Sequence, residues 1–420
     1  MKSYWDFTPA DTSTRSEREY RQELLERMRQ SVRAHLVSDV PLGAFLSGGL
    51  DSSTIVALMS ADMTEPVKTF SIGFQESAFN ELPHARAVAD RFATDHHELV
   101  VEPKAIESLP TLLTHFDEPF GDSSAIPTYL VSKIARNRVT VVLTGDGGDE
   151  LFGGYEWQRR YLMTRRLGAL PLSLRRRLPT LASAFPVPGL YRVQQDKVAS
   201  FLLDAASPPE EGYMRRLTLL DLASRRALYS PDLFNRLEGC DSRRALQKWV
   251  RRLPATDFRN RMLYADTHFY CPEDCLTKVD RMSMAWSLEA RVPFLDHTLV
   301  EFAAGIPPNL KLRGLTSKYL LRETMRGILP SSLLQRGKRG FSIPLAAWLR
   351  GPLHDPLCDA LLGERLRRRG WLRPEVIERM IHQHTSGERD HAHRLWALLA
   401  LESWAQKYLD RTRVPEAVSR

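Results

Sequence analysis

The chain has 420 residues, a mass of 48.0 kDa and a formal net charge of +8. Its hydrophobic share of 43% and charged share of 26% are typical of a folded globular protein and exclude a disordered chain. No apolar run reaches the roughly 20 residues that cross a bilayer, and the N-terminus lacks the apolar centre of a signal peptide. With only four cysteines, we expect a cytoplasmic protein without membrane contact.

Two features could indicate other functions. Paired arginines, such as Arg159-Arg160 and Arg215-Arg216, could contact nucleic acid, but no aromatic residues are interleaved with them and no recognition motif accompanies them. We therefore interpret them as solvated helix faces that also attract anionic substrates, and expect no nucleic-acid partner. Cys271 and Cys275 could be half of a metal site, but no second Cys or His pair at zinc spacing accompanies them.

The first part of the chain alternates between predicted helices and apolar strands. Residues 1–15 are polar and are expected to form a tether. Ser16 and Glu19 form a capping-box pattern at the start of the first helix. Strands are predicted over 41–46, 67–74, 97–101 and 139–143, and helices over 16–37, 53–59, 80–92, 106–115 and 126–135. This alternation predicts an α/β fold with a doubly wound parallel sheet.

The composition changes after Tyr155, where the chain becomes rich in Leu, Arg and Ala with proline breaks. We expect residues 16–155 to form a nucleotide-binding α/β core and residues 156–405 to form a mostly helical remainder packed on the sheet. Residues 406–420 are expected to be a C-terminal tail.

The most specific motif is Ser47-Gly48-Gly49-Leu50-Asp51-Ser52-Ser53, which follows the first strand. Its glycines permit a tight turn, and its hydroxyls and helix-terminal N–H groups would converge on a pyrophosphate group. Asp51 would repel phosphate unless it binds Mg²⁺. An ordinary glycine-rich turn is the alternative. The pattern is neither a Walker loop nor a GxGxxG dinucleotide turn.

A second motif, TGDGGDELFGGY from Thr144, follows the fourth strand. Ligands bind at the carboxyl ends of parallel strands, so this loop and the Ser47 loop should face one site. Its acids suit a second Mg²⁺ ligand and a group that handles protons. Taken by itself, this motif could also be a solvated acidic turn. A third segment, SKYLLRE from Ser317, contains Lys318, which by pattern alone is more simply a surface charge.

Taken together, these motifs resemble the synthetase domain of glutamine-hydrolysing asparagine synthetase. The resemblance includes SLEARVPFLD from Ser287 and covers roughly residues 16–405 in the family's order. It implies a fold of the PP-loop ATP pyrophosphatase type (adenine-nucleotide alpha-hydrolase type). It also implies formation of β-aspartyl-AMP from ATP and aspartate, followed by transfer of ammonia to give asparagine, AMP and pyrophosphate. Glu289, Arg291 and Asp296 match a family signature that we interpret mainly as structural.

The resemblance also implies a role for each matching residue. Asp146 would assist formation and amination of the acyl-adenylate, although some members have Glu there, and Lys318 would stabilise negative charge. Asp51 and Asp149 would bind Mg²⁺. The remaining contacts with ATP would come from Leu46 and Ile72 beside the adenine, Ser47, Gly48, Gly49, Ser52 and Ser53 at the pyrophosphate, and the backbone of Thr144 and Gly145.

One departure concerns the nitrogen source. Complete enzymes of the family begin with a glutaminase domain whose nucleophile is a Cys directly after Met1, whereas this chain has Lys2. We therefore expect no glutaminase half here, and a separate glutaminase domain or subunit is an expected partner.

Other activities within and outside the family stay open. A lasso-peptide cyclase or a β-lactam synthetase would use the same chemistry on another carboxylate, and Asp146 argues against the second, which has Tyr there. A tRNA-modifying ligase is favoured only by the net charge. An inactive nucleotide-binding scaffold is disfavoured by the intact Asp51, Asp149 and Lys318.

Overall fold

The computed structural model describes residues 3–410, apart from residues 13, 168–169, 185–191, 255, 338–339 and 341. Its strands are β1 (Leu42–Phe45), β2 (Lys68–Phe74), β3 (Asp95–Val101), β4 (Val141–Leu143) and β5 (Glu289–Arg291). They form one parallel sheet in the order β3-β2-β1-β4-β5. The predicted doubly wound parallel sheet is therefore confirmed.

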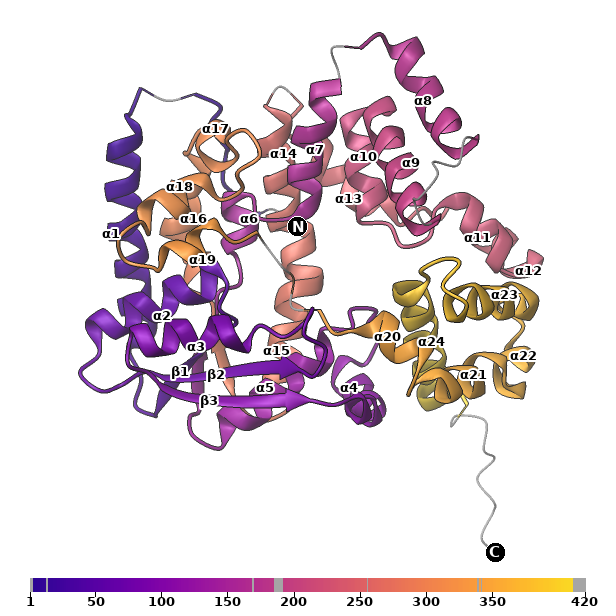
Figure 1. The fold of residues 1–420 in the computed structure, drawn as a ribbon, viewed down its shortest axis with the longest axis horizontal. Coiled ribbons are helices and arrows are strands. Elements are labelled where there is room, and N and C mark those ends of the chain that lie inside the picture. The colour runs from indigo at the N-terminus through magenta and orange to yellow at the C-terminus, as the bar shows by residue number, and fades with distance from the viewer. Residues whose placement is uncertain are drawn as a thin grey trace, which may run out of the picture.

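The helices before residue 156 connect these strands (Figure 1). They are α1 (Glu17–Leu36), α2 (Leu50–Asp62), α3 (Leu82–Arg91), the 3-10 turn η1 (Pro103–Ser108), α4 (Leu109–Phe116), α5 (Ala125–Arg136) and α6 (Gly148–Phe152). Helix α1 begins with the predicted capping box, in which the Ser16 side chain accepts from the Glu19 backbone and the Glu19 carboxylate accepts from Ser16 N.

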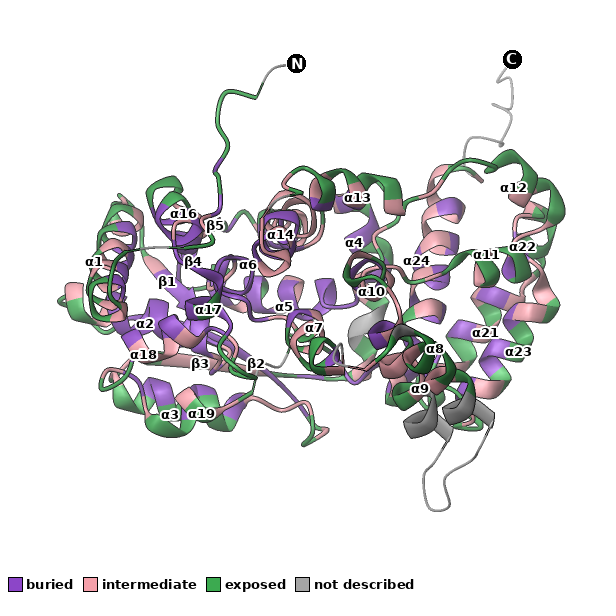
Figure 2. Cartoon of the chain, turned by 90° about the horizontal axis from the view of Figure 1, so that it is seen from above, coloured by how far each residue is buried: buried purple, intermediate pink, exposed green. Residues whose placement is uncertain are grey.

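Both faces of the sheet are covered. Val141 and Leu143 of β4 belong to a hydrophobic cluster with α1, α2 and α3, and Val142 between them belongs to a second cluster with α4 and α5. This alternation along one strand separates the two cores, as expected for a pleated sheet covered on both sides. Figure 2 shows that α2 and α5 are buried along most of their length.

The remainder of the described chain is mostly helical, as predicted, and contributes β5 to the sheet. It comprises α7 (Glu156–Arg166), α8 (Leu172–Ala184), α9 (Arg192–Ala206), α10 (Pro209–Arg216), α11 (Leu222–Leu228), α12 (Pro231–Arg236), α13 (Arg243–Arg251), α14 (Phe258–Ala265), the π-helical η3 (Asp266–Leu276), α15 (Thr277–Met284), the 3-10 turn η4 (Pro293–Leu295), α16 (His297–Ala304), α17 (Pro308–Lys311), α18 (Tyr319–Thr324), α19 (Ser331–Gln335), α20 (Leu345–Arg350), α21 (His354–Leu362), α22 (Glu364–Arg369), α23 (Pro374–Thr385) and α24 (Ala392–Tyr408).

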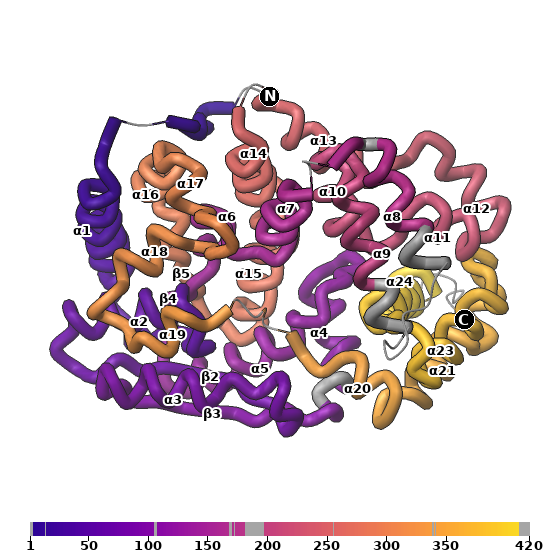
Figure 3. Tube along the Cα trace, turned by 45° about the horizontal axis from the view of Figure 1, so that its top comes forward, coloured from indigo at the N-terminus to yellow at the C-terminus, as the bar shows by residue number. Residues whose placement is uncertain are grey.

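The last helices lie beside the middle of the chain. Ser230 N donates to Trp371 O at 2.9 Å, and Arg373 N donates to Leu228 O at 2.8 Å. These bonds join the α11–α12 connection to the start of α23, and Figure 3 shows the two segments side by side. Helix α24 continues beyond residue 405, so the expected C-terminal tail begins later than predicted. Residues 411–420 of that tail lie outside the described residues.

The N-terminal segment, which we expected to be a tether, is docked on the helices in its described part. Phe7 is buried with its ring 5.2 Å from that of Tyr264, and the Asp6 carboxylate forms a 2.7 Å ion pair with Arg252. Each of these partners lies more than 200 positions away, so a local pattern in residues 3–12 could not have predicted the docking.

A lysine is buried beside this segment. The side chain of Lys311, at the end of α17, is 3% exposed, and no residue in the described part of the chain forms an ion pair or a side-chain hydrogen bond with it. Burial lowers the pKa of Lys311 from 10.5 to about 7, against the opposing effect of Asp11. A lysine pKa that is lower in the folded state reduces stability as the pH falls from about 10.5 towards 7.

We therefore expect Lys311→Met to stabilise the protein near neutral pH. The free energy of unfolding at pH 7.5 should rise by about 1 kcal/mol or more, because the variant removes an uncompensated buried charge. The gain should shrink as the pH rises to 10. Chemical denaturation across this pH range measures it, with exposed Lys248→Met as the control. A gain that stays constant with pH would contradict this account.

Candidate active site

Two glycine-rich loops leave neighbouring strands at one edge of the sheet. Residues 46–49 connect β1 to α2, and residues 144–147 connect β4 to α6. The strand order reverses between β1 and β4, which is where doubly wound sheets bind ligands. A Cβ added at Gly145 would lie 2.6 Å from Ser52 N, so only glycine allows the two loops to approach this closely.

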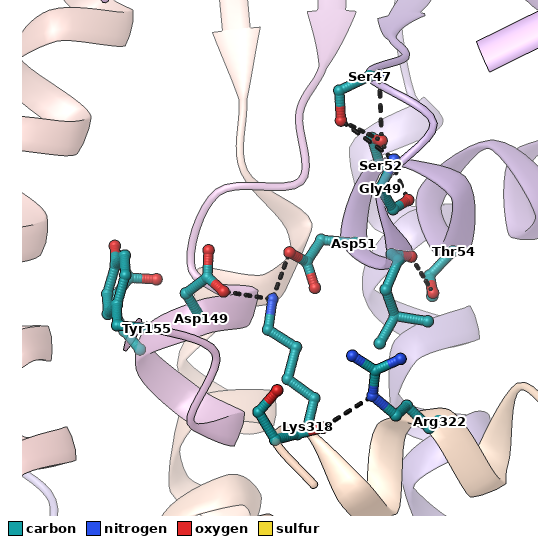
Figure 4. Close-up of polar contacts among 12 residues, drawn as sticks. Ser47, Gly49, Asp51, Ser52, Thr54, Asp149, Tyr155, Lys318 and Arg322 are labelled. Atoms are coloured by element: carbon teal, nitrogen blue, oxygen red, sulfur yellow. Dashed lines mark hydrogen bonds and ion pairs between the residues drawn. The ribbon is translucent and has the colours of Figure 1, made fainter. Parts of the chain in front are cut away.

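The loop after β1 is held in place by its own hydroxyl groups. Gly48 adopts a left-handed conformation, with φ of +68°, in which a Cβ would lie 2.5 Å from the Ala85 nitrogen. Ser47 N donates to Ser52 Oγ at 3.2 Å, and Gly49 N donates to Ser47 Oγ at 3.3 Å (Figure 4). The loop is thus organised before a ligand binds, with the N-terminus of α2 behind it.

The ammonium group of Lys318 lies between two buried carboxylates (Figure 4). Lys318 Nζ donates to Asp51 Oδ2 and lies 2.5 Å from Asp149 Oδ1. Lys318 is 2% exposed, and each aspartate is 8% exposed. The sequence predicted all three residues as site residues, and the structure brings them together although they lie on α2, on α6 and before α18. The burial of Lys318 excludes the alternative of a surface charge.

The backbone around this group allows no additional atoms. A Cβ added at Gly154 would lie 1.7 Å from Asp149 Oδ1 and 2.2 Å from Lys318 Cε. Lys318 itself has a φ of +52°, an uncommon conformation for a residue with a long side chain. The close packing at Gly154 and the left-handed backbone at Lys318 together fix the position of the ammonium group.

A cavity extends from these residues along the carboxyl ends of β1, β2 and β4. Buried Thr144 Oγ1 has no hydrogen-bond partner among the described residues and so remains available to a ligand. Twelve of the thirteen predicted site residues line this cavity: Leu46, Ser47, Gly48, Gly49, Asp51, Ser52, Ile72, Thr144, Gly145, Asp146, Asp149 and Lys318. The other one, Ser53, is fully buried beside the cavity, and its N–H group donates to Gly49 O.

A second, larger cavity adjoins the first at Asp146 and Asp149, which line both. Lys278 of α15 also lines both, and its ammonium lies 2.8 Å from Asp122 Oδ2. Burial opposes the charge on Lys278, but Asp122 and Asp274 together raise its pKa above the usual value. The larger cavity is therefore lined by a partly buried cation and by the carboxylates of Asp122, Asp146 and Asp149.

Two buried acids, Glu150 and Asp266, lie on elements that line the cavities, and Glu150 itself lines the smaller one. Tyr155 donates to Glu150 Oε1 at 2.5 Å, and burial together with the Asp149 charge raises the pKa of Glu150 to about 7. Asp266 of η3 accepts from Tyr213 at 2.7 Å and from Gln158 at 2.5 Å, and burial raises its pKa to about 7. Their hydrogen bonds join α6 to Tyr155, and η3 to α7 and α10.

The two aspartates suit a divalent cation supplied with a substrate. Within the described part of the chain, no three His, Cys, Asp or Glu side chains gather into a metal site of their own. Mg²⁺ commonly binds through one or two carboxylates plus substrate phosphates and water, which matches Asp51 and Asp149. Lys318 already places one positive charge between these carboxylates, so a cation is stable beside them.

Sequence reasoning missed several cavity residues. Lys278 and Arg322 line both cavities, and Arg336 donates to Gly48 O at 3.2 Å. Arg322 lies within the SKYLLRE segment, so that motif could have indicated it. Arg291, interpreted as structural, donates to His35 O and Val37 O, and Asp296 caps α16 through Thr298 N.

The parallel sheet, its strand order and the phosphate-type loop after β1 define the PP-loop ATP pyrophosphatase class of α/β folds. The chain belongs to the asparagine synthase family, whose model matches residues 23–406. The predicted resemblance is therefore confirmed.

The chain is similar to two proteins named as asparagine synthetases and to one named as an amidase. The chain is 31% identical over its whole length to asparagine synthetase [glutamine-hydrolyzing] 1 of Bacillus subtilis (strain 168), and covers 64% of that protein. It is 32% identical over 94% of its length to a putative asparagine synthetase of Mycobacterium tuberculosis (strain ATCC 25618 / H37Rv), covering 59%. It is also 27% identical over 89% of its length to amidase chyE of Penicillium rubens, covering 60%. The chain thus spans about three fifths of these relatives.

A helix that crosses a membrane needs about 20 mostly apolar residues. None of the helices in the described part of the chain combines the length and apolar character that crossing a bilayer requires.

The packing around Gly154 gives a prediction for stability. We expect Gly154→Ala to lower the free energy of unfolding by about 2 kcal/mol or more, because its Cβ would push apart Asp149 and Lys318. Gly212→Ala in α10, where the nearest atom to the added Cβ would be Asp204 Cβ of α9 at 3.6 Å, should cost less than about 1 kcal/mol. Equal unfolding curves for the two variants in denaturant would show that the site is less tightly packed.

Proposed function

We propose that this protein is an ATP-dependent amide synthetase that forms β-aspartyl-AMP and transfers ammonia to it. The products are asparagine, AMP and pyrophosphate. The observation that carries the proposal is the Lys318 ammonium between Asp51 and Asp149, at the junction of the two cavities. Family membership supports the same chemistry.

The nucleotide would occupy the cavity at the ends of β1, β2 and β4. Leu46 and Ile72 would contact the adenine, and the backbone of Thr144 and Gly145 would contact the nucleotide. The loop from Ser47 to Ser53 would hold the β- and γ-phosphates through N–H and hydroxyl groups. Mg²⁺ held by Asp51 and Asp149 would neutralise charge on the pyrophosphate leaving group.

The first chemical step would occur where the two cavities meet. A side-chain carboxylate oxygen of aspartate attacks the α-phosphorus of ATP, and the bond to the β-phosphate oxygen breaks to release pyrophosphate. Lys318 lies beside this point and would stabilise negative charge on the phosphoryl oxygens in the transition state. Its buried position makes that interaction stronger than it would be in water.

In the second step, ammonia attacks the carbonyl carbon of the adenylate. Asp146, which lines both cavities, would take a proton from the attacking nitrogen. The carbon–oxygen bond to AMP then breaks, which leaves the amide. Ammonia could come from solution or from a separate glutaminase.

An amino-acid substrate is supported by the charges in the larger cavity. Lys278 and Asp122 lie 2.8 Å apart there, and Ser124 N donates to Asp122 Oδ1 at 2.9 Å. A neighbouring cation and anion offer partners for both the α-carboxylate and the α-ammonium group of a zwitterion. This arrangement favours a free amino acid such as aspartate over a carboxylate without charged substituents.

The products of ATP test the proposed reaction. Incubation with ATP, Mg²⁺, aspartate and ammonium should give AMP, pyrophosphate and asparagine in equal amounts, measured by chromatography and mass spectrometry. Asp51→Asn should remove most of this activity, and Lys318→Ala should lower the rate by roughly 10²-fold or more. ADP and orthophosphate as products would contradict adenylation. A higher rate with another carboxylate would contradict aspartate as the substrate and leave the adenylation chemistry standing.

The charge pair in the larger cavity gives a separate test. Lys278→Met should raise the KM for the carboxylate substrate by about tenfold or more, with little change in the KM for ATP, because one charged contact is lost. Lys278→Arg should restore part of the affinity, and exposed Lys133→Met on α5 serves as the control. A rise in both KM values together would indicate a general structural role for Lys278.

A further inference from the structure

Four basic side chains line the nucleotide cavity within the described part of the chain. Three of them have carboxylate partners: Lys318 pairs with Asp51 and Asp149, Lys278 with Asp122, and Arg336 with Glu81. The fourth, Arg322 of α18, forms no ion pair with any described residue. Arg322 thus differs from the other three cations of this cavity, since no carboxylate of the described residues forms an ion pair with it to balance its charge.

The guanidinium of Arg322 is held in place by main-chain oxygens alone. Its Nε donates to Ser317 O at 2.8 Å, and its Nη1 donates to Leu334 O at 2.5 Å. These neutral acceptors orient the planar group but do not neutralise its charge. Of the five N–H donors of an arginine, three remain for another acceptor.

The environment of Arg322 makes an uncompensated charge costly. The side chain is half-buried, and burial lowers its pKa even though the Asp51 charge opposes this effect. A partly desolvated cation without a protein counter-ion is stabilised when an anionic ligand binds. Arg322 projects from the same segment as Lys318, toward the start of α2 (Figure 4).

We propose that Arg322 binds the β- and γ-phosphates of ATP, and afterwards the pyrophosphate product, as their additional cationic ligand. Its remaining N–H donors can contact two phosphate oxygens at once, which a guanidinium does better than an ammonium. Asp51 and Lys318 lie on one side of the phosphate position, and Arg322 would close the other. This inference rests on the proposed function, because it assumes that the cavity binds a nucleotide.

Binding measurements with the separate products test this role. Titration calorimetry of the whole chain with pyrophosphate plus Mg²⁺, and separately with AMP, gives two dissociation constants. For Arg322→Gln, the dissociation constant for pyrophosphate should rise about tenfold or more, and that for AMP should change less than about threefold. Arg326→Gln is the matched control, because Arg326 is exposed and already pairs with Glu323 at 2.5 Å.

Two results would overturn the assignment. One is an unchanged dissociation constant for pyrophosphate in folded Arg322→Gln, and the other is an equal loss of affinity for pyrophosphate and AMP. If the wild-type chain binds neither ligand, the proposed nucleotide function fails instead, so the two failures are distinguishable.

A labelling experiment on the wild-type chain does not depend on the folding of a variant. Phenylglyoxal reacts with accessible guanidinium groups, and peptide mass spectrometry locates the modified arginines. Pyrophosphate with Mg²⁺ should protect Arg322 from this reagent, and AMP should not. Equal labelling of Arg322 with and without pyrophosphate would overturn the proposal.

Discussion

The ammonium of Lys318 between the carboxylates of Asp51 and Asp149 is the interaction on which the site depends. It joins three segments that are far apart in the sequence: the first turn of α2, helix α6 and the residue before α18. Removing one partner of a buried ion pair costs several kcal/mol in typical proteins, so the loss of this cation would destabilise the two carboxylates. The same group provides positive charge where a phosphoryl oxygen would become more negative.

The order of the strands explains why these loops meet. The chain builds β1, β2 and β3 outward in one direction and then returns to place β4 on the other side of β1. The carboxyl ends of β1 and β4 are thereby neighbours, and the helices that follow them, α2 and α6, pack in the same hydrophobic cluster. Gly145 and Gly154 then permit approaches that a single methyl group would block. The strand order thus places the two loops next to each other, and the glycines allow their atoms to come into close contact.

The sequence could predict the elements and loops that are marked by short, continuous residue patterns. Apolar strands, the glycine-rich heptad and the acidic loop are continuous patterns, so four strands of the sheet and the two loops that line the cavity followed from them. The polar β5 (Glu289–Arg291), the docking of Phe7, the Lys278–Asp122 ion pair and the burial of Lys311 depend on residues far away in the sequence. A lysine or arginine in a helix has the same local pattern whether it faces solvent or a cavity, so burial could not be predicted.

The central claim is that Asp51 and Asp149 share a cation with the phosphates while Lys318 contacts the reacting group. A crystal structure with Mn²⁺ and a non-hydrolysable ATP analogue tests it most directly, because Mn²⁺ is located by its anomalous scattering. The account predicts an anomalous peak bonded to oxygens of both aspartates and of the analogue, with Lys318 Nζ on a phosphate oxygen. A peak that touches neither aspartate, or phosphates bound away from the Ser47 loop, would contradict it.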